Sequence, residues 1–132
     1  MEMPREWKTQ IRWFFGKSGT GKTRKALTES KSMNMGELYV KSADTSKWFD
    51  WYDGHQLCLL DDLRMMDFSF GFLLRLFDRY PMRVECKGGT RQFVAKTLWV
   101  TSPDPPTHFV PLGEDSYQMT RRIECIEHKQ NS

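Results

Sequence analysis

Short apolar runs alternate with polar segments along the first half of the chain, which predicts strands that alternate with helices. Residues 11–16 are largely apolar and end in glycine, a pattern typical of a buried strand that enters a tight turn. Residues 22–33 favour a helix with a basic, polar outer face, and Asn34 follows as a stop signal. Shorter apolar runs at 38–41 and 57–60 predict two further strands.

The second half of the chain adds a helix and a hairpin to this pattern. Residues 68–80 carry apolar side chains at helical spacing, and Pro81 follows them, so we expect a helix over this range. Two strand-like runs, at 83–86 and 90–94, flank a Lys-Gly-Gly turn, which predicts a β-hairpin.

Two more apolar runs complete the set of strands. Residues 97–101 predict a buried strand that prolines bring to an end, and residues 122–127 predict a final strand. The pattern therefore favours an α/β fold, with a central, mostly parallel five-stranded sheet flanked by helices and an inserted β-hairpin. The chain suits one domain, 1–132, in which residues 1–8 could form a linker.

Composition narrows the class of protein only slightly. The 20 basic and 17 acidic residues give a net charge of +3, which permits a polyanionic partner but does not require one. Cys58, Cys86 and Cys125 are far apart, so we expect small core residues rather than disulfides or a zinc site. The first residues are too polar for a signal peptide, and no apolar run approaches the roughly 20 residues that span a bilayer.

The segment between the first strand and the first helix fits the phosphate-binding pattern G-x-x-x-x-G-K-[ST]. Its glycines let the backbone curl so that N–H groups point at phosphate oxygens, and the helix aims its positive end at the same place. Lys22 would bridge the β- and γ-phosphates of ATP, and the Thr23 hydroxyl would bind Mg²⁺. The residues expected to hold ATP are Gly16, Lys17, Ser18, Gly19, Thr20, Gly21, Lys22 and Thr23.

Two adjacent acids, Asp61 and Asp62, follow the apolar run at 57–60. A carboxylate at the end of a buried strand beside a phosphate loop is well placed to hold Mg²⁺. We expect Asp61 to hold the metal through water and Asp62 to polarise the attacking water as a general base. Both acids could instead simply begin a solvated loop, but the phosphate loop favours the metal site.

Taken together, these motifs resemble the superfamily 3 helicase domain, an AAA+-like P-loop NTPase, of the Rep proteins of circular single-stranded DNA viruses, circovirus-like in particular. The stretch from D-R-Y-P to K-G-G-T is the most specific part of the resemblance, which covers nearly the whole chain. The matching pieces, in order, lie at 16–23, 47–54, 60–62, 73–81, 84–90, 101–102 and 121–123.

The resemblance implies a DNA helicase of a viral rolling-circle replication initiator, which would act as a homo-oligomeric ring, usually a hexamer, in the host cell nucleus. ATP would bind between neighbouring subunits, and the hairpin would project into the central pore. There Lys87, at the tip with Gly88 and Gly89, would grip the phosphates of single-stranded DNA. A lysine in such a turn could also be merely solvated.

The resemblance also implies an arginine finger and a water-orienting sensor. Arg121 and Arg122 match the finger region, where an arginine of one subunit reaches the γ-phosphate bound by the next. Either could equally be a plain surface residue. The family usually places the sensor asparagine after Thr-Ser, where this chain has Pro103. The candidates to replace that asparagine are Ser102, Thr101 and Asp104.

The sequence also bears on the nuclease domain, on the aromatic segment 48–52 and on other classes of nucleotide-binding protein. The family's nicking nuclease has a His-hydrophobic-His pair that this sequence lacks, so we expect a helicase domain without the nuclease domain. The aromatic segment 48–52 could stack on adenine or on bases, although such residues more often pack a small domain. A small-molecule kinase of nucleosides or nucleotides, or an ATP-binding switch with little turnover, would share the phosphate loop.

Overall fold

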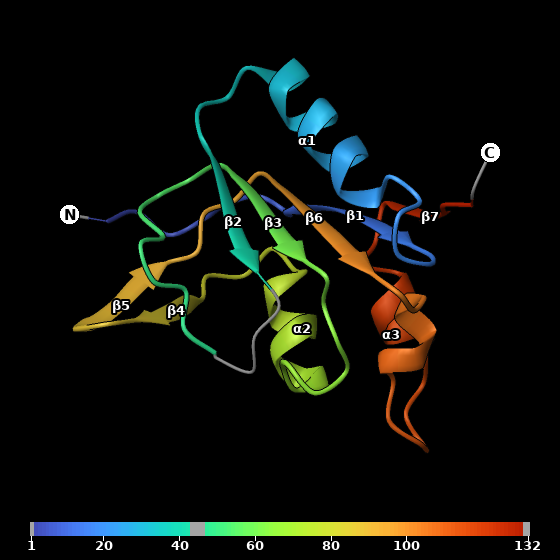
Figure 1. The fold of residues 1–132 in the computed structure, drawn as a ribbon. Coiled ribbons are helices and arrows are strands. Elements are labelled where there is room, and N and C mark those ends of the chain that lie inside the picture. Colours follow the sequence, from blue (N-terminus) through green and yellow to red (C-terminus); the bar gives the residue numbers. More distant parts are fainter. Residues whose placement is uncertain (1, 43–46, 131–132) are drawn as a thin grey trace.

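A five-stranded parallel sheet organises the chain. The computed structural model describes residues 2–42 and 47–130, so residues 44–46 of the loop expected at 44–56 lie outside the described residues. The strands run in the order β2-β3-β6-β1-β7, and every ladder between neighbours is parallel, which confirms the predicted sheet (Figure 1). The five strands are β1 (Gln10–Phe15), β2 (Leu38–Ser42), β3 (Leu57–Asp61), β6 (Thr97–Ser102) and β7 (Cys125–His128).

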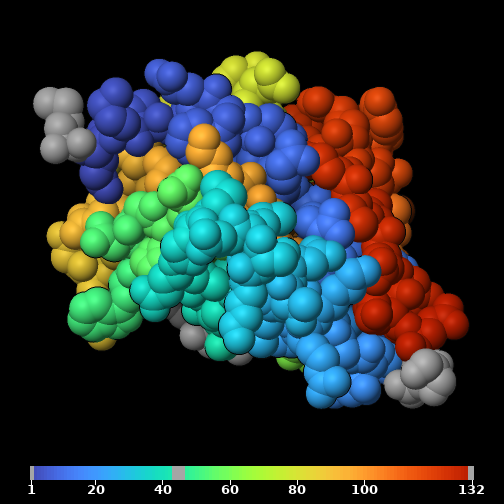
Figure 2. Space-filling model, turned by 90° about the horizontal axis from the view of Figure 1, so that it is seen from above, coloured from blue at the N-terminus to red at the C-terminus, as the bar shows by residue number. Residues whose placement is uncertain are grey.

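Helices cover both faces of the sheet, as expected. The helix α1 (Lys22–Met33) lies on one face, and α2 (Phe70–Leu76) lies on the other (Figure 1). Figure 2, which looks onto the α1 face, shows α1 and the segment after it spread over the middle of this face. Two short helices, the 3-10 helix η1 (Pro106–Phe109) and α3 (Tyr117–Thr120), were not predicted, because four residues are too few to show a period.

Strand alternation divides the core into two layers. Neighbouring side chains of a strand point to opposite faces, and in β1 Trp13 joins the larger cluster, whereas Phe14 packs with Ala26 of α1. The central strand β6 is buried along its whole length, as expected for a parallel strand covered on both faces. Cys58 and Cys86 are free and buried, in agreement with their predicted role in the core, whereas Cys125 is free and only partly buried against the smaller cluster.

The hairpin is inserted between α2 and β6. Its strands β4 (Arg83–Cys86) and β5 (Gly89–Gln92) are antiparallel, and Cys86 pairs with Gly89. The second strand was predicted at 90–94, but it begins one residue earlier and stops at Gln92. Phe93 and Ala95 are fully buried, so the chain leaves the hairpin there to enter the core.

Two element boundaries differ further from the prediction. The helix expected over 68–80 covers only Phe70–Leu76, and Ser69 caps its start by accepting a hydrogen bond from the Phe72 N–H. The last strand was expected at 122–127, but β7 is Cys125–His128, because the turn after α3 occupies the positions before it.

Arg5 explains why α2 ends early. Its side chain is 1% exposed, and its guanidinium donates hydrogen bonds to the carbonyls of Leu76 (2.9 Å), Arg75 (2.6 Å) and Tyr80 (2.8 Å) and to the Thr9 hydroxyl (3.0 Å). Carbonyls at the end of a helix need such partners. Arg5 falls within the range 1–8 that was considered as a linker, and here it is packed into the domain. Burial lowers its pKa to about 10, which leaves it charged at neutral pH.

Replacing Arg5 with methionine should therefore destabilise the fold. Arg5→Met keeps the bulk of the side chain but removes four hydrogen bonds, so we expect the free energy of unfolding to fall by about 3 kcal/mol. Urea denaturation followed by circular dichroism measures this change. Arg79→Met is the matched control, because Arg79 is exposed; equal stability of the two variants would contradict the role given to Arg5.

Candidate nucleotide-binding site

The loop between β1 and α1 is built so that only glycine fits at its first position. Gly16 has a φ of +148°, and a Cβ there would meet the carbonyl oxygen of Lys129 at 2.3 Å. Gly21, directly before α1, has a φ of +88°, in the left-handed region that glycine occupies without strain. The backbone can therefore curl over the start of a 12-residue helix, whose positive end points into the loop.

The ammonium group of Lys22 lies inside this curl. It donates hydrogen bonds to the carbonyl oxygens of Gly16 and Lys17, the second at 3.2 Å. A lysine in this position faces whatever the loop encloses. The phosphate-binding role of Lys22 stays a prediction, and the structure shows its ammonium group directed into the loop.

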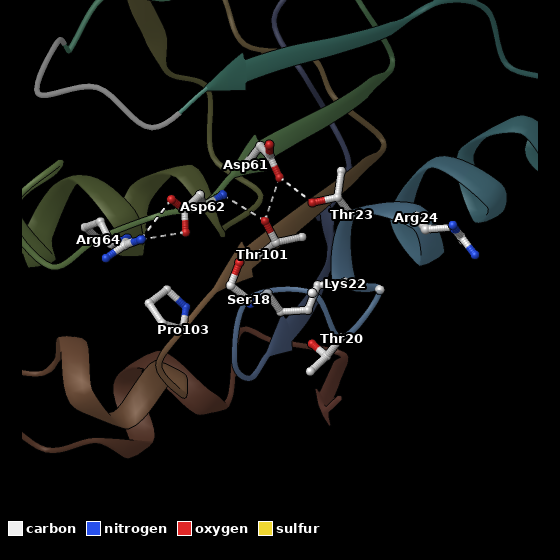
Figure 3. Close-up of a pocket in the computed structure, with 12 residues that line it drawn as sticks. Ser18, Thr20, Lys22, Thr23, Arg24, Asp61, Asp62, Arg64, Thr101 and Pro103 are labelled. Atoms are coloured by element: carbon white, nitrogen blue, oxygen red, sulfur yellow. Dashed lines mark hydrogen bonds and ion pairs between the residues drawn. The ribbon is translucent and has the colours of Figure 1, made fainter. Parts of the chain in front are cut away.

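One carboxylate oxygen connects the loop helix to the sheet. Oδ1 of Asp61 accepts a hydrogen bond from the Thr23 hydroxyl at 2.8 Å and a second from the Thr101 hydroxyl at 2.8 Å (Figure 3). Thr23 lies in the first turn of α1, whereas Asp61 and Thr101 lie at the carboxyl ends of the adjacent strands β3 and β6. Sequence reasoning placed Thr23 and Asp61 at one metal site, and the structure brings them into contact.

Asp62 is held in an uncommon backbone conformation. Its φ is +60°, and its N–H donates to the Thr101 hydroxyl at 2.8 Å. A left-handed φ in a residue other than glycine stores strain and often marks a functional position. The Asp62 carboxylate accepts hydrogen bonds from Nη2 of Arg64 at 2.9 and 3.1 Å.

Arg24 and Arg64 line this site although sequence reasoning did not name them, and the role of Thr101 was not foreseen. The signal for Arg64 was a basic residue two positions after the acid pair. Thr101 was considered only as a substitute sensor; its hydroxyl in fact joins Asp61 to the Asp62 backbone.

These groups surround a cavity of about 330 Å³. It opens at the carboxyl ends of β1, β3 and β6, the edge where parallel α/β sheets bind their ligands. Figure 3 shows Arg24 and Arg64 at opposite sides of it, with Lys22 between them. Its lining residues are Ser18, Gly19, Thr20, Gly21, Lys22, Thr23, Arg24, Asp61, Asp62, Arg64, Thr101 and Pro103.

The structure does not bring the other two sensor candidates into the cavity. The Ser102 hydroxyl donates to the Leu63 carbonyl at 2.8 Å and accepts from the Asp104 N–H at 3.1 Å, and its side chain is fully buried. The carboxylate of Asp104 lies 3.4 Å from Nδ1 of His108. Neither residue lines the cavity, whereas Thr101 and Pro103 both do.

The two arginines of the expected finger region differ in their surroundings. Arg122 forms an ion pair with Asp78 at 3.0 Å, and both side chains are largely buried. Burial alone would raise the pKa of Asp78, but hydrogen bonds from the Arg79 N–H and from Arg122 outweigh it, so the pKa is lowered. Arg121 is exposed, and its side chain makes no hydrogen bond or ion pair within the described part of the chain. Neither arginine lines the cavity of its own chain.

The hairpin lies away from the nucleotide cavity. Lys87 is exposed at its tip with Gly88 and Gly89, and Figure 1 shows the hairpin on the opposite side of the molecule from the loop that precedes α1. Lys87 therefore cannot contact a phosphate chain bound at the loop of its own subunit.

Together, a phosphate loop and an acid pair at the carboxyl edge of a parallel sheet define a P-loop nucleoside triphosphatase fold. Residues 12–103 match the model of a family described as RNA helicase, and the chain belongs to this family. The resemblance drawn from the motifs is thereby confirmed. In the part of the chain that the structure describes, no helix is long and apolar enough to cross a membrane.

The relatives of the chain are viral replication proteins. The replication-associated protein of goose circovirus is 40% identical over 123 residues, which cover 93% of this chain and 40% of that protein. The replication-associated protein of porcine circovirus 1 is 35% identical over 128 residues, 93% of this chain and 38% of that protein. That of beak and feather disease virus is 36% identical over 128 residues, 93% of this chain and 40% of that protein. The chain thus spans about two fifths of the length of these curated relatives.

The hydrogen bonds of Thr101 can be tested by removing its hydroxyl alone. Thr101→Val keeps the shape of a side chain that is 1% exposed but leaves the Asp62 N–H without its partner. We expect the free energy of unfolding to fall by about 1–3 kcal/mol. Thermal unfolding of the two proteins measures the change.

Thr97→Val is the matched control for this substitution. Thr97 is a buried threonine of the same strand, and, unlike that of Thr101, its hydroxyl takes part in none of the side-chain hydrogen bonds found among the described residues. An equal loss of stability in both variants would show that the Thr101 network contributes nothing specific.

Proposed function

We propose that this chain is the motor domain of a helicase that hydrolyses ATP with Mg²⁺ and moves on single-stranded DNA. The observation that carries the proposal is the contact between Thr23 of the phosphate loop and Asp61 of the acid pair. A hydroxyl and a carboxylate that already touch can bind one small cation together, and Mg²⁺ prefers oxygen ligands of this kind. Bound there, Mg²⁺ would neutralise charge that develops on the phosphates.

Each neighbouring group would then have one role. The backbone N–H groups of the loop and the Lys22 ammonium bind the phosphates, for which Lys22 gives up its contacts with the loop carbonyls. Asp62 accepts a proton from the attacking water, which requires that its carboxylate be free of Arg64. Arg64 is exposed and lies at the cavity wall, so it can turn to the triphosphate without disturbing the core.

The rest of the active site would come from a second copy of the chain. Neither Arg121 nor Arg122 lines the cavity of its own chain, and Arg121 is the exposed member of this candidate pair. We assign the finger to Arg121 and a structural role to Arg122, whose guanidinium already binds Asp78. This arrangement needs a ring, which we take to be a hexamer that works in the host cell nucleus. In it, Lys87 would contact DNA phosphates.

A nucleotide switch with slow turnover is the second candidate function. Pro103 lines the cavity where the family usually has an asparagine, and proline has no N–H or polar side chain with which to orient water. The Ser102 hydroxyl is already occupied within the chain. Under this alternative the protein binds ATP and changes its contacts without appreciable hydrolysis.

Hydrolysis of ATP with and without single-stranded DNA separates these functions. We expect DNA to raise the rate in the native protein, and we expect Lys22→Ala to abolish hydrolysis because the loop loses its cation. Single-stranded RNA of the same length is the control that shows whether stimulation of hydrolysis requires DNA. Binding without turnover would favour the switch, and transfer of phosphate to a nucleoside would favour a kinase.

Mixing two inactive variants tests the shared site. Arg121→Ala keeps Lys22, and Lys22→Ala keeps Arg121, so a mixed ring contains interfaces with both residues intact. We therefore expect each variant alone to lose hydrolysis by about 10³-fold or more, and the mixture to regain part of it. A mixture as inactive as its components would contradict a finger supplied by Arg121 of a neighbour.

A further inference from the structure

In the part of the chain that the structure describes, Trp51 combines an unfavourable backbone conformation with an exposed apolar ring. Its φ is +71°, a left-handed conformation that is a genuine outlier for a bulky residue. Its side chain is also 91% exposed, whereas Phe49 and Tyr52 in the same segment are buried at 0% and 1%. The aromatic segment expected at 48–52 thus divides: those two rings pack the core, and the Trp51 indole faces solvent. A strained, exposed aromatic residue suggests a function outside the fold.

The segment that carries Trp51 is fixed against the hairpin. The N–H of Phe49 donates to the Glu85 carbonyl of β4 at 2.7 Å, and Cys86 Sγ lies 3.1 Å from the Phe49 carbonyl oxygen. At the tip, the N–H of Lys87 donates to the Asp50 carboxylate at 2.8 Å. The residues that precede Trp51 are therefore tied to the hairpin that carries Lys87.

Trp51 also borders a hollow that has cations on its wall. The hollow has a volume of about 420 Å³, and its lining combines the indole with Lys87 and Arg91 of the hairpin. Asp50 and Asp53 border it too, but one oxygen of Asp50 is occupied by the Lys87 N–H. The lining residues are Asp50, Trp51, Tyr52, Asp53, Cys86, Lys87 and Arg91.

We propose that Trp51 is a stacking platform for a base of the single-stranded nucleic acid whose phosphates Lys87 contacts, an inference that rests on the proposed function. Single-strand binding sites pair cations for the backbone with aromatic rings for the bases, and stacking tolerates any base because each has a flat face. The hairpin supplies the cations, and Trp51, which lines the same hollow, supplies the ring. The site would bind any nucleobase, because stacking does not involve the hydrogen-bonding edge of the base.

The test distinguishes the affinity that comes from contacts with the bases from the affinity that comes from contacts with the phosphate backbone. Binding of fluorescent oligothymidylate is compared with binding of an abasic oligomer of equal length, by anisotropy with a non-hydrolysable ATP analogue present. We expect Trp51→Asn to bind the thymidylate strand about tenfold more weakly, because stacking is lost, and to bind the abasic strand like the native protein. Trp51→Phe should keep most of the affinity, because it keeps a ring.

The choice of asparagine excludes misfolding as an explanation. Asparagine tolerates the left-handed conformation better than tryptophan, so Trp51→Asn should unfold at the same or a higher temperature than the native protein. Tyr80→Asn is the matched control, because Tyr80 is 68% exposed but does not border the hollow. This control should bind both strands like the native protein.

The remaining outcomes distinguish this inference from the proposed function. If native protein binds the strand and Lys87→Ala weakens binding to both oligomers, but Trp51→Asn binds like native, the stacking role is wrong and the function stands. If Trp51→Asn weakens binding to both oligomers equally and lowers the mass of the assembly in sedimentation, Trp51 contacts a second copy and the inference is overturned. If native protein binds neither strand, the proposed function itself fails.

Discussion

The geometry of the nucleotide site depends on the two hydrogen bonds that the Asp61 carboxylate accepts. Its Oδ1 accepts both the Thr23 hydroxyl and the Thr101 hydroxyl, so a single oxygen joins α1, β3 and β6. The parallel ladder sets this geometry, because Leu60 pairs with Val100 and the next residues along the two strands are Asp61 and Thr101. The Thr101 hydroxyl then holds the Asp62 N–H, which supports the left-handed turn of the proposed general base. A slip of the β3–β6 register by one residue would separate all of these groups.

Arg5 and Arg122 stabilise the segment that connects the nucleotide site to the hairpin. The chain runs from Asp62 through α2 directly into β4. Arg5 binds carbonyls at the end of α2, and Arg122 binds Asp78 just beyond it. The proposed finger, Arg121, is the neighbour of one of these anchors in the sequence. The same small region thus supports both the DNA-binding tip and the subunit contact that we propose.

The sequence predicted those features that depend on local patterns. Apolar runs predicted all five strands of the sheet, since a buried parallel strand needs only a short stretch of apolar residues. The phosphate loop and the acid pair were also predicted, because their chemistry requires adjacent residues in a set order. The end of α2 was not, since Arg5 caps it from 71 positions away in the chain.

Contacts between distant residues explain what the sequence left undecided. Thr101 meets Asp61 across 40 positions, so no linear pattern could assign it to the acid pair. The choice between Arg121 and Arg122 also depended on the fold, because only the structure shows Asp78 beside Arg122. In the segment 48–52, composition could not distinguish buried rings from exposed ones. The structure shows that Phe49 and Tyr52 are buried, whereas Trp51, which has a positive φ, is exposed.

Electron paramagnetic resonance of Mn²⁺ shows whether Thr23 and Asp61 share a divalent cation once nucleotide is bound. Free Mn²⁺ is titrated with protein in the presence of a non-hydrolysable ATP analogue, for the native chain, Thr23→Val and Asp61→Asn. We expect the native protein to take up one ion per chain only when nucleotide is present, and both variants to bind it about tenfold more weakly or worse. Uptake by both variants equal to that of the native chain would contradict a shared cation site.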